Sequence, residues 1–175
     1  MKLTHEHLRA AVRDVIDFPK EGIVFKDLTT VFKQPDYLRF MVDEIYQLYQ
    51  DVPITKVVGI ESRGFILGTA LAYVFEAGFV PIRKKGKLPS KTNSKEYSLE
   101  YGTDCIEIHQ DAIEENDVVL LHDDLLATGG TASAAVDLIC QCPVQALHCN
   151  FIIELDFLKG REKLNGQKVT SLIHY

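Results

Sequence analysis

Two uninterrupted apolar runs constrain the fold of this 175-residue chain more than any other feature. Lys56–Ile60 and Val118–Leu121 are rich in β-branched and aliphatic residues and do not alternate with polar ones. Such runs are typical of strands buried on both faces, as the central strands of a parallel sheet are. Each run precedes a polar loop and then a helix-like pattern, over about 65–75 and from Thr131 onward. This order predicts an α/β fold with a mainly parallel, twisted sheet and helices on both faces.

The flanking segments extend this pattern. Thr4–Ile16 has a helical apolar stripe with Thr4 as a suitable N-cap, and a second helix is expected to open at Pro35. Phe79–Ile82 predicts a strand, Cys105–Ile108 alternates like a strand with one solvated face, and Ala146–Ile153 predicts a last long strand. The length suits a single domain spanning residues 1–175.

Bulk composition excludes several classes of function. The formal net charge of −6 argues against a nucleic-acid-binding protein, which needs a basic face. No apolar run approaches the roughly 20 residues of a membrane helix, and the charged N-terminal segment is no secretion signal. The four cysteines (Cys105, Cys140, Cys142 and Cys149) form no CxxC pair, so we expect reduced, mostly buried thiols in a cytoplasmic protein and not a zinc site or a disulfide.

Three polar loops directly follow predicted strands: Glu61–Gly64, Arg83–Gly102 and His122–Gly130. In open α/β sheets, ligands bind at the carboxyl ends of the strands. We therefore expect these three loops to form the functional site. The length and polarity of Arg83–Gly102 suit a flexible lid over that site.

The third loop carries the most specific signal. Asp123 and Asp124 end a strand, and Ala127-Thr128-Gly129-Gly130-Thr131 then opens a helix that Thr128 or Thr131 is expected to cap. The glycines let the backbone approach a ligand, and N–H groups at a helix start form a nest for phosphate. The loop lacks the lysine of GxxxxGK[ST] and is not GxGxxG. Paired acids followed by a phosphate nest suit a sugar phosphate, with the carboxylates on its hydroxyl groups.

This segment resembles the 5-phosphoribosyl-1-pyrophosphate (PRPP) motif of type I phosphoribosyltransferases. Other blocks narrow the resemblance to the adenine phosphoribosyltransferase family over about residues 14–173. They are Asp17–Pro19 with Gly22, Phe25–Asp27, Ser62–Phe65, Arg83–Pro89, Tyr97–Gly102 and Leu158–Glu162. The PRPP motif alone specifies only the superfamily, whereas YSLEYG together with RKKGKLP points to adenine.

The resemblance implies the division of the chain and the roles of its residues. Residues 1–35 would form a small base-binding hood, and 36–175 a core that includes the lid loop 83–102. Adenine would contact Val24, Phe25, Lys26 and Leu155. The ribose and 5′-phosphate would contact Asp123, Asp124, Ala127, Thr128, Gly129, Gly130 and Thr131. Pyrophosphate would contact Glu61, Ser62, Arg63, Arg83, Lys84 and Lys87, with a cis peptide between Glu61 and Ser62 and one cation supplied across a dimer interface. Glu100 would be the catalytic base at N7 of adenine.

The implied reaction joins adenine to PRPP and yields AMP and pyrophosphate, in a homodimer that binds no nucleic acid or membrane. Mg²⁺ would be held by PRPP and water, without direct protein ligands. Three positions depart from the family pattern: His122 replaces an aliphatic residue, Glu61 replaces Asp, and Lys26 replaces Arg. Two alternatives stay open, namely a phosphoribosyltransferase for a 6-oxopurine or another base, and a non-catalytic PRPP or purine sensor on the same fold.

Overall fold

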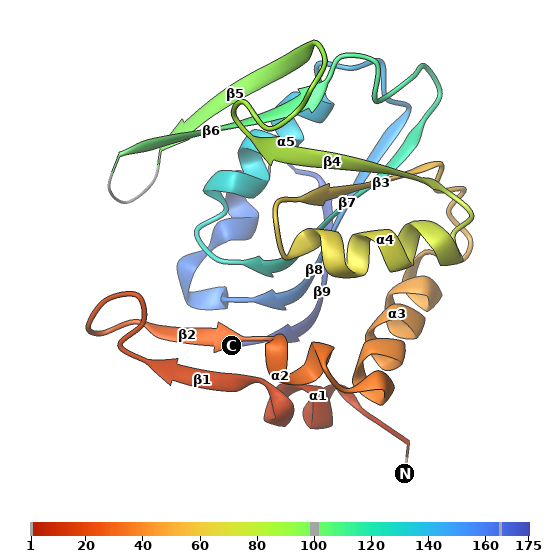
Figure 1. The fold of residues 1–175 in the computed structure, drawn as a ribbon. Helices are drawn as coiled ribbons and strands as arrows, with labels where there is room; N and C mark the ends of the chain where they lie inside the picture. The colour runs from red at the N-terminus through yellow and green to blue at the C-terminus, as the bar shows by residue number, and fades with distance from the viewer. Residues whose placement is uncertain (1, 99–101, 165) are drawn as a thin grey trace.

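The computed structural model describes residues 2–98, 102–164 and 166–175. Its centre is a seven-stranded sheet in the order β5-β6-β4-β3-β7-β8-β9 (Figure 1). The strands are β3 (Lys56–Ile60), β4 (Gly78–Lys84), β5 (Thr92–Ser98), β6 (Thr103–His109), β7 (Val118–Leu126), β8 (Ala146–Glu154) and β9 (Lys168–His174). The strands from β4 to β9 in this order run parallel, whereas β6 is antiparallel to β4 and to β5. The predicted α/β class with a mainly parallel sheet is confirmed.

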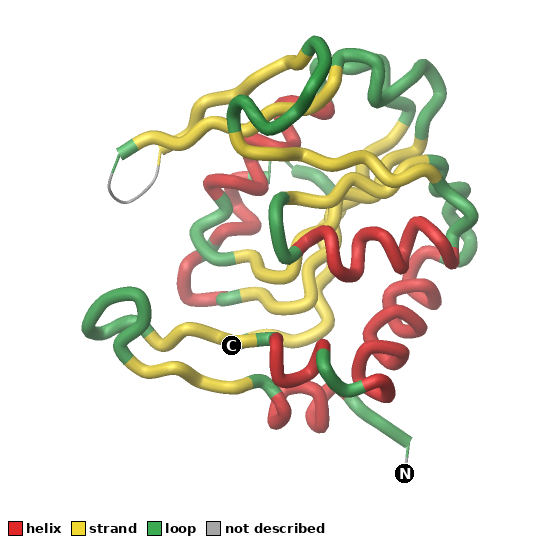
Figure 2. Tube along the Cα trace, in the orientation of Figure 1, coloured by secondary structure: helices red, strands yellow, loops and turns green. Residues whose placement is uncertain are grey.

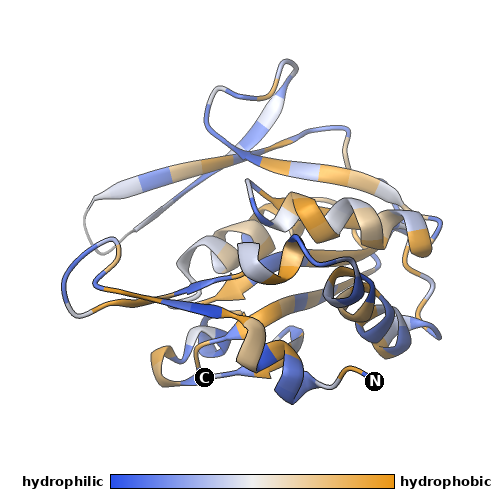
Figure 3. Cartoon of the chain, turned by 60° about the horizontal axis from the view of Figure 1, so that its bottom comes forward, coloured by the Kyte–Doolittle hydropathy of each residue, from blue (hydrophilic) through white to orange (hydrophobic). Residues whose placement is uncertain are grey.

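Helices cover both faces of the sheet, and each face has its own apolar core. The helices are α1 (His5–Ala11), α2 (Thr29–Phe32), α3 (Pro35–Tyr49), α4 (Gly64–Val74) and α5 (Gly130–Ile139), with 3₁₀ turns η1 (Asp156–Leu158) and η2 (Gly160–Lys163). α5 packs with Val58 and Leu121 on one face, and α1, α3 and α4 pack with Val57 and Leu120 on the other. The hydrophobic colour of Figure 3 accordingly gathers along the central strands. No helix in the described ranges is both long and apolar enough to span a membrane.

Two hairpins project beyond the same side of the sheet (Figure 2). One pairs β1 (Arg13–Ile16) with β2 (Val24–Asp27), and the other pairs β5 with β6. The predicted helix over Thr4–Ile16 is therefore wrong in its second half. α1 ends at Ala11 because Val12 is extended and Val15 pairs with Phe25 of β2. The predicted cap is confirmed, since the His7 backbone N–H donates to Thr4 Oγ1 at 3.3 Å.

The expectation that 83–102 is a loop is also wrong in part. β4 continues to Lys84, and Thr92–Ser98 forms β5, which pairs along its whole length with β6. The polar sequence of β5 fits an edge strand with one solvated face. The hairpin is docked on α5, because Lys95 Nζ lies 2.8 Å from Asp137 Oδ2.

Three further strand predictions need correction. Cys105–Ile108 is buried on both faces, because the 85–87 turn covers the face opposite the core, where the Gly86 N–H donates to Glu107 Oε2 at 3.0 Å. β7 continues to Leu126 through its pairing with β8, so the predicted loop from His122 is partly strand. Ala146–Glu154 is not the last strand, since β9 follows it.

All four cysteines are free thiols. Cys105 and Cys149 are buried, Cys142 is half-buried and Cys140 is exposed.

Candidate active site

The acid pair Asp123–Asp124 lies inside β7 near its carboxyl end. Asp123 pairs with Phe151 of β8, which fixes the position of the pair in the sheet. Asp123 is half-buried, and Asp124 is only 3% exposed. Arg63, at the start of α4, places its Nε 2.7 Å from Asp124 Oδ2. The predicted pyrophosphate cation is therefore in contact with the predicted ribose clamp.

The surroundings of both acids favour the protonated form. Burial raises the pKa of Asp123 well above its usual range, and the neighbouring Asp124 carboxylate raises it further. Burial also raises the pKa of Asp124, although the Arg63 guanidinium opposes that shift. A carboxylate that is desolvated in this way gains most from hydrogen bonds donated by a ligand.

Residues 127–131 lead from β7 into α5 and line a cavity of about 200 Å³ together with Asp123. Gly129 is the N-cap of α5 and has φ +76°, in the left-handed region that glycine adopts without steric cost. The predicted threonine cap is wrong, because no side chain in the described residues caps this helix. The N–H groups of the first turn therefore stay available, and with the helix dipole they suit a phosphate.

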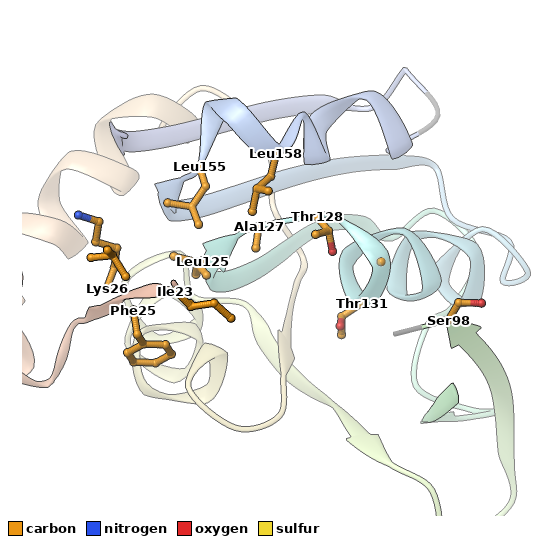
Figure 4. A pocket seen from close by; sticks show the side chains of 12 residues that line it. Ile23, Phe25, Lys26, Ser98, Leu125, Ala127, Thr128, Thr131, Leu155 and Leu158 are labelled. Carbon is orange, nitrogen blue, oxygen red and sulfur yellow. The ribbon is translucent and has the colours of Figure 1, made fainter. Parts of the chain in front are cut away.

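A second cavity, of about 290 Å³, adjoins the same loop and has mostly apolar walls (Figure 4). Its lining residues are Ile23, Val24, Phe25, Lys26, Ser98, Leu125, Ala127, Thr128, Gly130, Thr131, Leu155 and Leu158. All four residues predicted to contact a base are among them. Five residues, Leu125, Ala127, Thr128, Gly130 and Thr131, line both cavities. One segment thus lines both the apolar cavity and the cavity at the start of α5.

The side chain of Lys26 points away from the apolar cavity (Figure 4). Its Nζ lies 2.7 Å from Asp14 Oδ1 and 3.9 Å from the centroid of the Tyr175 ring. Lys26 therefore presents its backbone and the base of its side chain to the cavity. The ammonium group makes its contacts outside the cavity.

Phe25 of β2 is connected to the acid pair through Arg63. Its ring makes an edge contact with Phe18 at 5.2 Å between centroids, and the Arg63 guanidinium carbon lies 5.0 Å from its centroid. A cation at this distance from an aromatic face is attracted to it. Arg63 thus contacts both Asp124 and a wall residue of the apolar cavity.

The first two predicted loops meet around the side chain of Glu61. Lys87 Nζ donates to Glu61 Oε1 at 2.5 Å, Arg83 Nε donates to Oε2 at 3.3 Å, and the Lys84 N–H donates to Oε2 at 3.0 Å. Burial on its own raises the pKa of Glu61, but these hydrogen bonds outweigh it and lower the pKa to about 2. The Glu61–Ser62 peptide is cis, and Ser62 is exposed. Glu61 therefore anchors the cations of Arg83 and Lys87, a role that sequence reasoning missed, whereas Lys84 Nζ lies 3.1 Å from Asp104 Oδ2.

Four residues of the apolar cavity were not predicted: Ile23, Ser98, Leu125 and Leu158. Leu125 would have been found if β7 had been extended past His122, since alternate strand residues share a face and Leu125 follows Asp123 by two. Leu158 belongs to a block that the resemblance singled out without giving it a role. The predicted base Glu100 lies outside the described residues.

His174, which showed no constellation in the sequence, lies beside Glu154 and Asp156. The three offer ligand atoms within 4.8 Å of one another, and His174 Nδ1 is 2.9 Å from Asp156 Oδ1. Glu154 is already engaged by Arg161 and Ser171, which donate to Oε2 at 2.5 Å and 2.6 Å. The cluster is a hydrogen-bonded, charge-paired group at the ends of β8 and β9.

Fold and site together define a class of proteins: α/β proteins with an acid pair near the end of a strand, a glycine loop that opens a helix, and an adjoining apolar pocket. The phosphoribosyl transferase domain model matches residues 30–169 of the chain, which include both acids and the whole phosphate loop. The match covers most of the sheet and all of α5.

Known proteins narrow this class. An adenine phosphoribosyltransferase of Phocaeicola vulgatus is 56% identical over 160 residues, which cover 91% of this chain and 92% of that protein. The crystal structure of adenine phosphoribosyltransferase from Rhodothermus marinus has a TM-score of 0.92 at 50% identity and covers 98% of each chain. The enzyme of Giardia lamblia, solved with 9-deazaadenine, has a TM-score of 0.94 at 41% identity and 99% coverage of each chain. The chain belongs to the adenine phosphoribosyltransferase family.

Proposed function

We propose that this chain transfers the 5-phosphoribosyl group of PRPP to adenine and releases AMP and pyrophosphate, a purine-salvage reaction. One observation carries the proposal: an apolar cavity and the cavity at the start of α5 share five lining residues. AMP has the matching layout, with an apolar base and a phosphate at opposite ends of a ribose. The comparisons support adenine as the base.

Each part of AMP has a place in this arrangement. Adenine contacts Val24, Phe25, Leu155 and the backbone of Lys26. The 5′-phosphate binds the N–H groups of Ala127, Thr128, Gly129, Gly130 and Thr131, and the ribose hydroxyls donate to Asp123 and Asp124. The raised pKa of both acids supports this assignment, because hydroxyl donors relieve the cost of keeping the carboxylates charged.

Pyrophosphate binds on the other side of the acid pair. We assign it to the Glu61–Ser62 peptide N–H, to Arg63 and to the cations Arg83, Lys84 and Lys87. Each of these cations has a carboxylate partner within 3.3 Å. When pyrophosphate is bound, it replaces those carboxylates as the partner of the cations. The cations then stabilise the negative charge that develops as pyrophosphate leaves.

Mg²⁺ fits this site as part of the substrate. The half-buried Asp123 carboxylate lines the phosphate cavity, where a cation bound to PRPP would meet negative charge. The ion would be held mainly by PRPP and water and would neutralise the departing pyrophosphate. Asp123 and Asp124 orient the hydroxyl groups that this complex presents.

Glu100 is assigned as the general base that removes the N7 proton of adenine while N9 attacks the ribose. This assignment rests on the resemblance of Tyr97–Gly102 to the corresponding block of the family. Residues 1–35 serve as the hood, and 36–175 form the core of the single domain. The lid expected as a simple loop over 83–102 contains β5, which pairs with β6 in a hairpin.

We also propose a homodimer in the cytoplasm. Two large apolar side chains of α4 are exposed, Ile66 at 45% and Tyr73 at 85%, and Tyr46 of α3 is exposed at 37%. A second copy that covers these side chains would remove apolar surface from water. The four free thiols fit a reducing compartment. Sedimentation of the wild type and of Tyr73→Glu tests the dimer, and a wild-type monomer would contradict it.

The decisive experiment incubates the protein and PRPP with adenine, guanine, hypoxanthine or xanthine, with and without Mg²⁺. We expect AMP from adenine only when Mg²⁺ is present. Nucleotide formation from a 6-oxopurine at equal efficiency would favour the first alternative. Tight PRPP binding without turnover of any base would favour the sensor.

A further inference from the structure

The segment that follows β8 contacts both compartments of the site. Residues 155–163, here called the brace, form the two 3₁₀ turns η1 and η2. Leu155 and Leu158 of the brace line the apolar cavity. Gly160, two residues later, packs against the phosphate loop. The brace therefore lines the apolar cavity and also contacts Ala127 and Gly129 of the loop that lines both cavities.

At Gly160 the backbone of the brace packs directly against the backbone of the phosphate loop. A Cβ built on Gly160 would overlap the Ala127 carbonyl oxygen and lie 3.0 Å from the Gly129 nitrogen. A Cβ built on Gly129 would overlap the Gly160 carbonyl oxygen. Because neither glycine leaves space for a side chain, any displacement of Gly160 is transmitted directly to the loop that holds phosphate.

Arg161 anchors the brace to the sheet. Its Nε donates to Glu154 Oε1 at 2.9 Å, its Nη2 donates to Oε2 at 2.5 Å, and its Nη1 donates to the Val169 carbonyl at 2.8 Å. The Glu154 side chain is 6% exposed and also accepts from Ser171 Oγ at 2.6 Å. This two-pronged geometry fixes the guanidinium in one orientation, which a lysine ammonium cannot reproduce.

We propose that Arg161 is a positioning residue that couples the adenine pocket to the phosphate loop. It contacts neither cavity itself. Arg161 holds the brace against β8 and β9. It thereby fixes the position of Leu155 and Leu158 in the cavity wall and the position of Gly160 against the loop. The proposal rests on the assignment of the two cavities to adenine and the 5′-phosphate.

The test compares Arg161→Gln, Arg161→Lys and the matched control Arg39→Gln. Arg39 is 71% exposed on α3 and has a carboxylate partner at 3.9 Å, so its loss leaves the site untouched. In Arg161→Gln we expect the KM values for adenine and for PRPP to rise together by about tenfold, the effect of losing a hydrogen bond to a charged group. We expect kcat to change much less. In Arg161→Lys, both KM values should lie between those of the wild type and those of Arg161→Gln.

A purely structural role would lower the melting temperature without moving either KM, and that result would overturn the proposal. A rise in the adenine KM alone would also overturn it, since the brace would then be only a pocket wall. If Arg161→Gln does not fold, Arg161→Lys decides by the same criterion. Loss of AMP formation in the wild type would instead refute the proposed function, so the two failures are distinguishable.

Discussion

Replacing Asp123 with asparagine should lower activity without lowering stability. The substitution keeps the size of the side chain and the oxygen that accepts from the Asp124 N–H at 2.9 Å. It removes the charge. Because burial raises the pKa of Asp123 above its unfolded value, the ionised carboxylate destabilises the folded protein at pH 7, and a neutral amide relieves that cost. We therefore expect a melting temperature equal to or above that of the wild type.

The activity should change in the opposite direction. Hydrogen bonds to a charged group contribute about 1.5–3 kcal/mol, which corresponds to roughly 10- to 150-fold in kcat/KM for PRPP. An amide oxygen accepts more weakly than a carboxylate, and its NH₂ group donates where an acceptor is needed. The loss should appear with PRPP as the varied substrate, because the proposed contact is to ribose hydroxyls.

The assay measures kcat/KM for PRPP at saturating adenine, together with thermal unfolding. Asp36→Asn is the control, since the Asp36 side chain is 81% exposed on α3. Unchanged kcat/KM in folded Asp123→Asn would refute the ribose contact. A clear drop in melting temperature would refute the argument that the buried charge costs stability.

Three other predictions follow from the site and its surroundings. Glu100→Gln should lower kcat by about 10²–10⁴-fold with PRPP affinity intact, and wild-type kcat with chemistry rate-limiting would remove Glu100 from the mechanism. Burial on its own raises the pKa of Asp27, but hydrogen bonds from Arg13 and Thr29 lower it to about 2. Its contribution to stability is therefore present above its unfolded pKa of about 4 and lost as pH falls toward 2. Asp27→Asn should reduce the pH dependence of the unfolding free energy in that range, and an unaltered pH profile would contradict this. Lys26→Met should leave the adenine KM nearly unchanged, because the ammonium points away from the cavity, and a large rise would contradict that geometry.

Local signals in the sequence are enough to predict the central strands β3 and β7 and the glycine loop at 127–131. Lys56–Ile60 and Val118–Leu121 predict buried strands because continuous β-branched and aliphatic runs are typical of strands buried on both faces. The loop at 127–131 was predicted from glycines and a helix start, which act within a few residues. The sequence does not predict β1, β5 or β9 as strands. β1 and β5 form by pairing with β2 and β6 in hairpins, and β9 by pairing with β8. Strand formation depends on such partners more than on the local residues.

Short stretches of sequence are enough to predict the fold class, the acid pair at a strand end and the glycine loop that follows it, whereas the residues of the base pocket are implied only by the family resemblance. Tertiary structure alone decided which partners those residues take. It placed Arg63 between Asp124 and Phe25, turned the Lys26 ammonium toward Asp14, and made Glu61 an anchor for the cations of the second loop. The reason is that the interaction energy of two charges depends on the distance between them in space. Those distances are fixed only when the folded sheet brings its strand ends together.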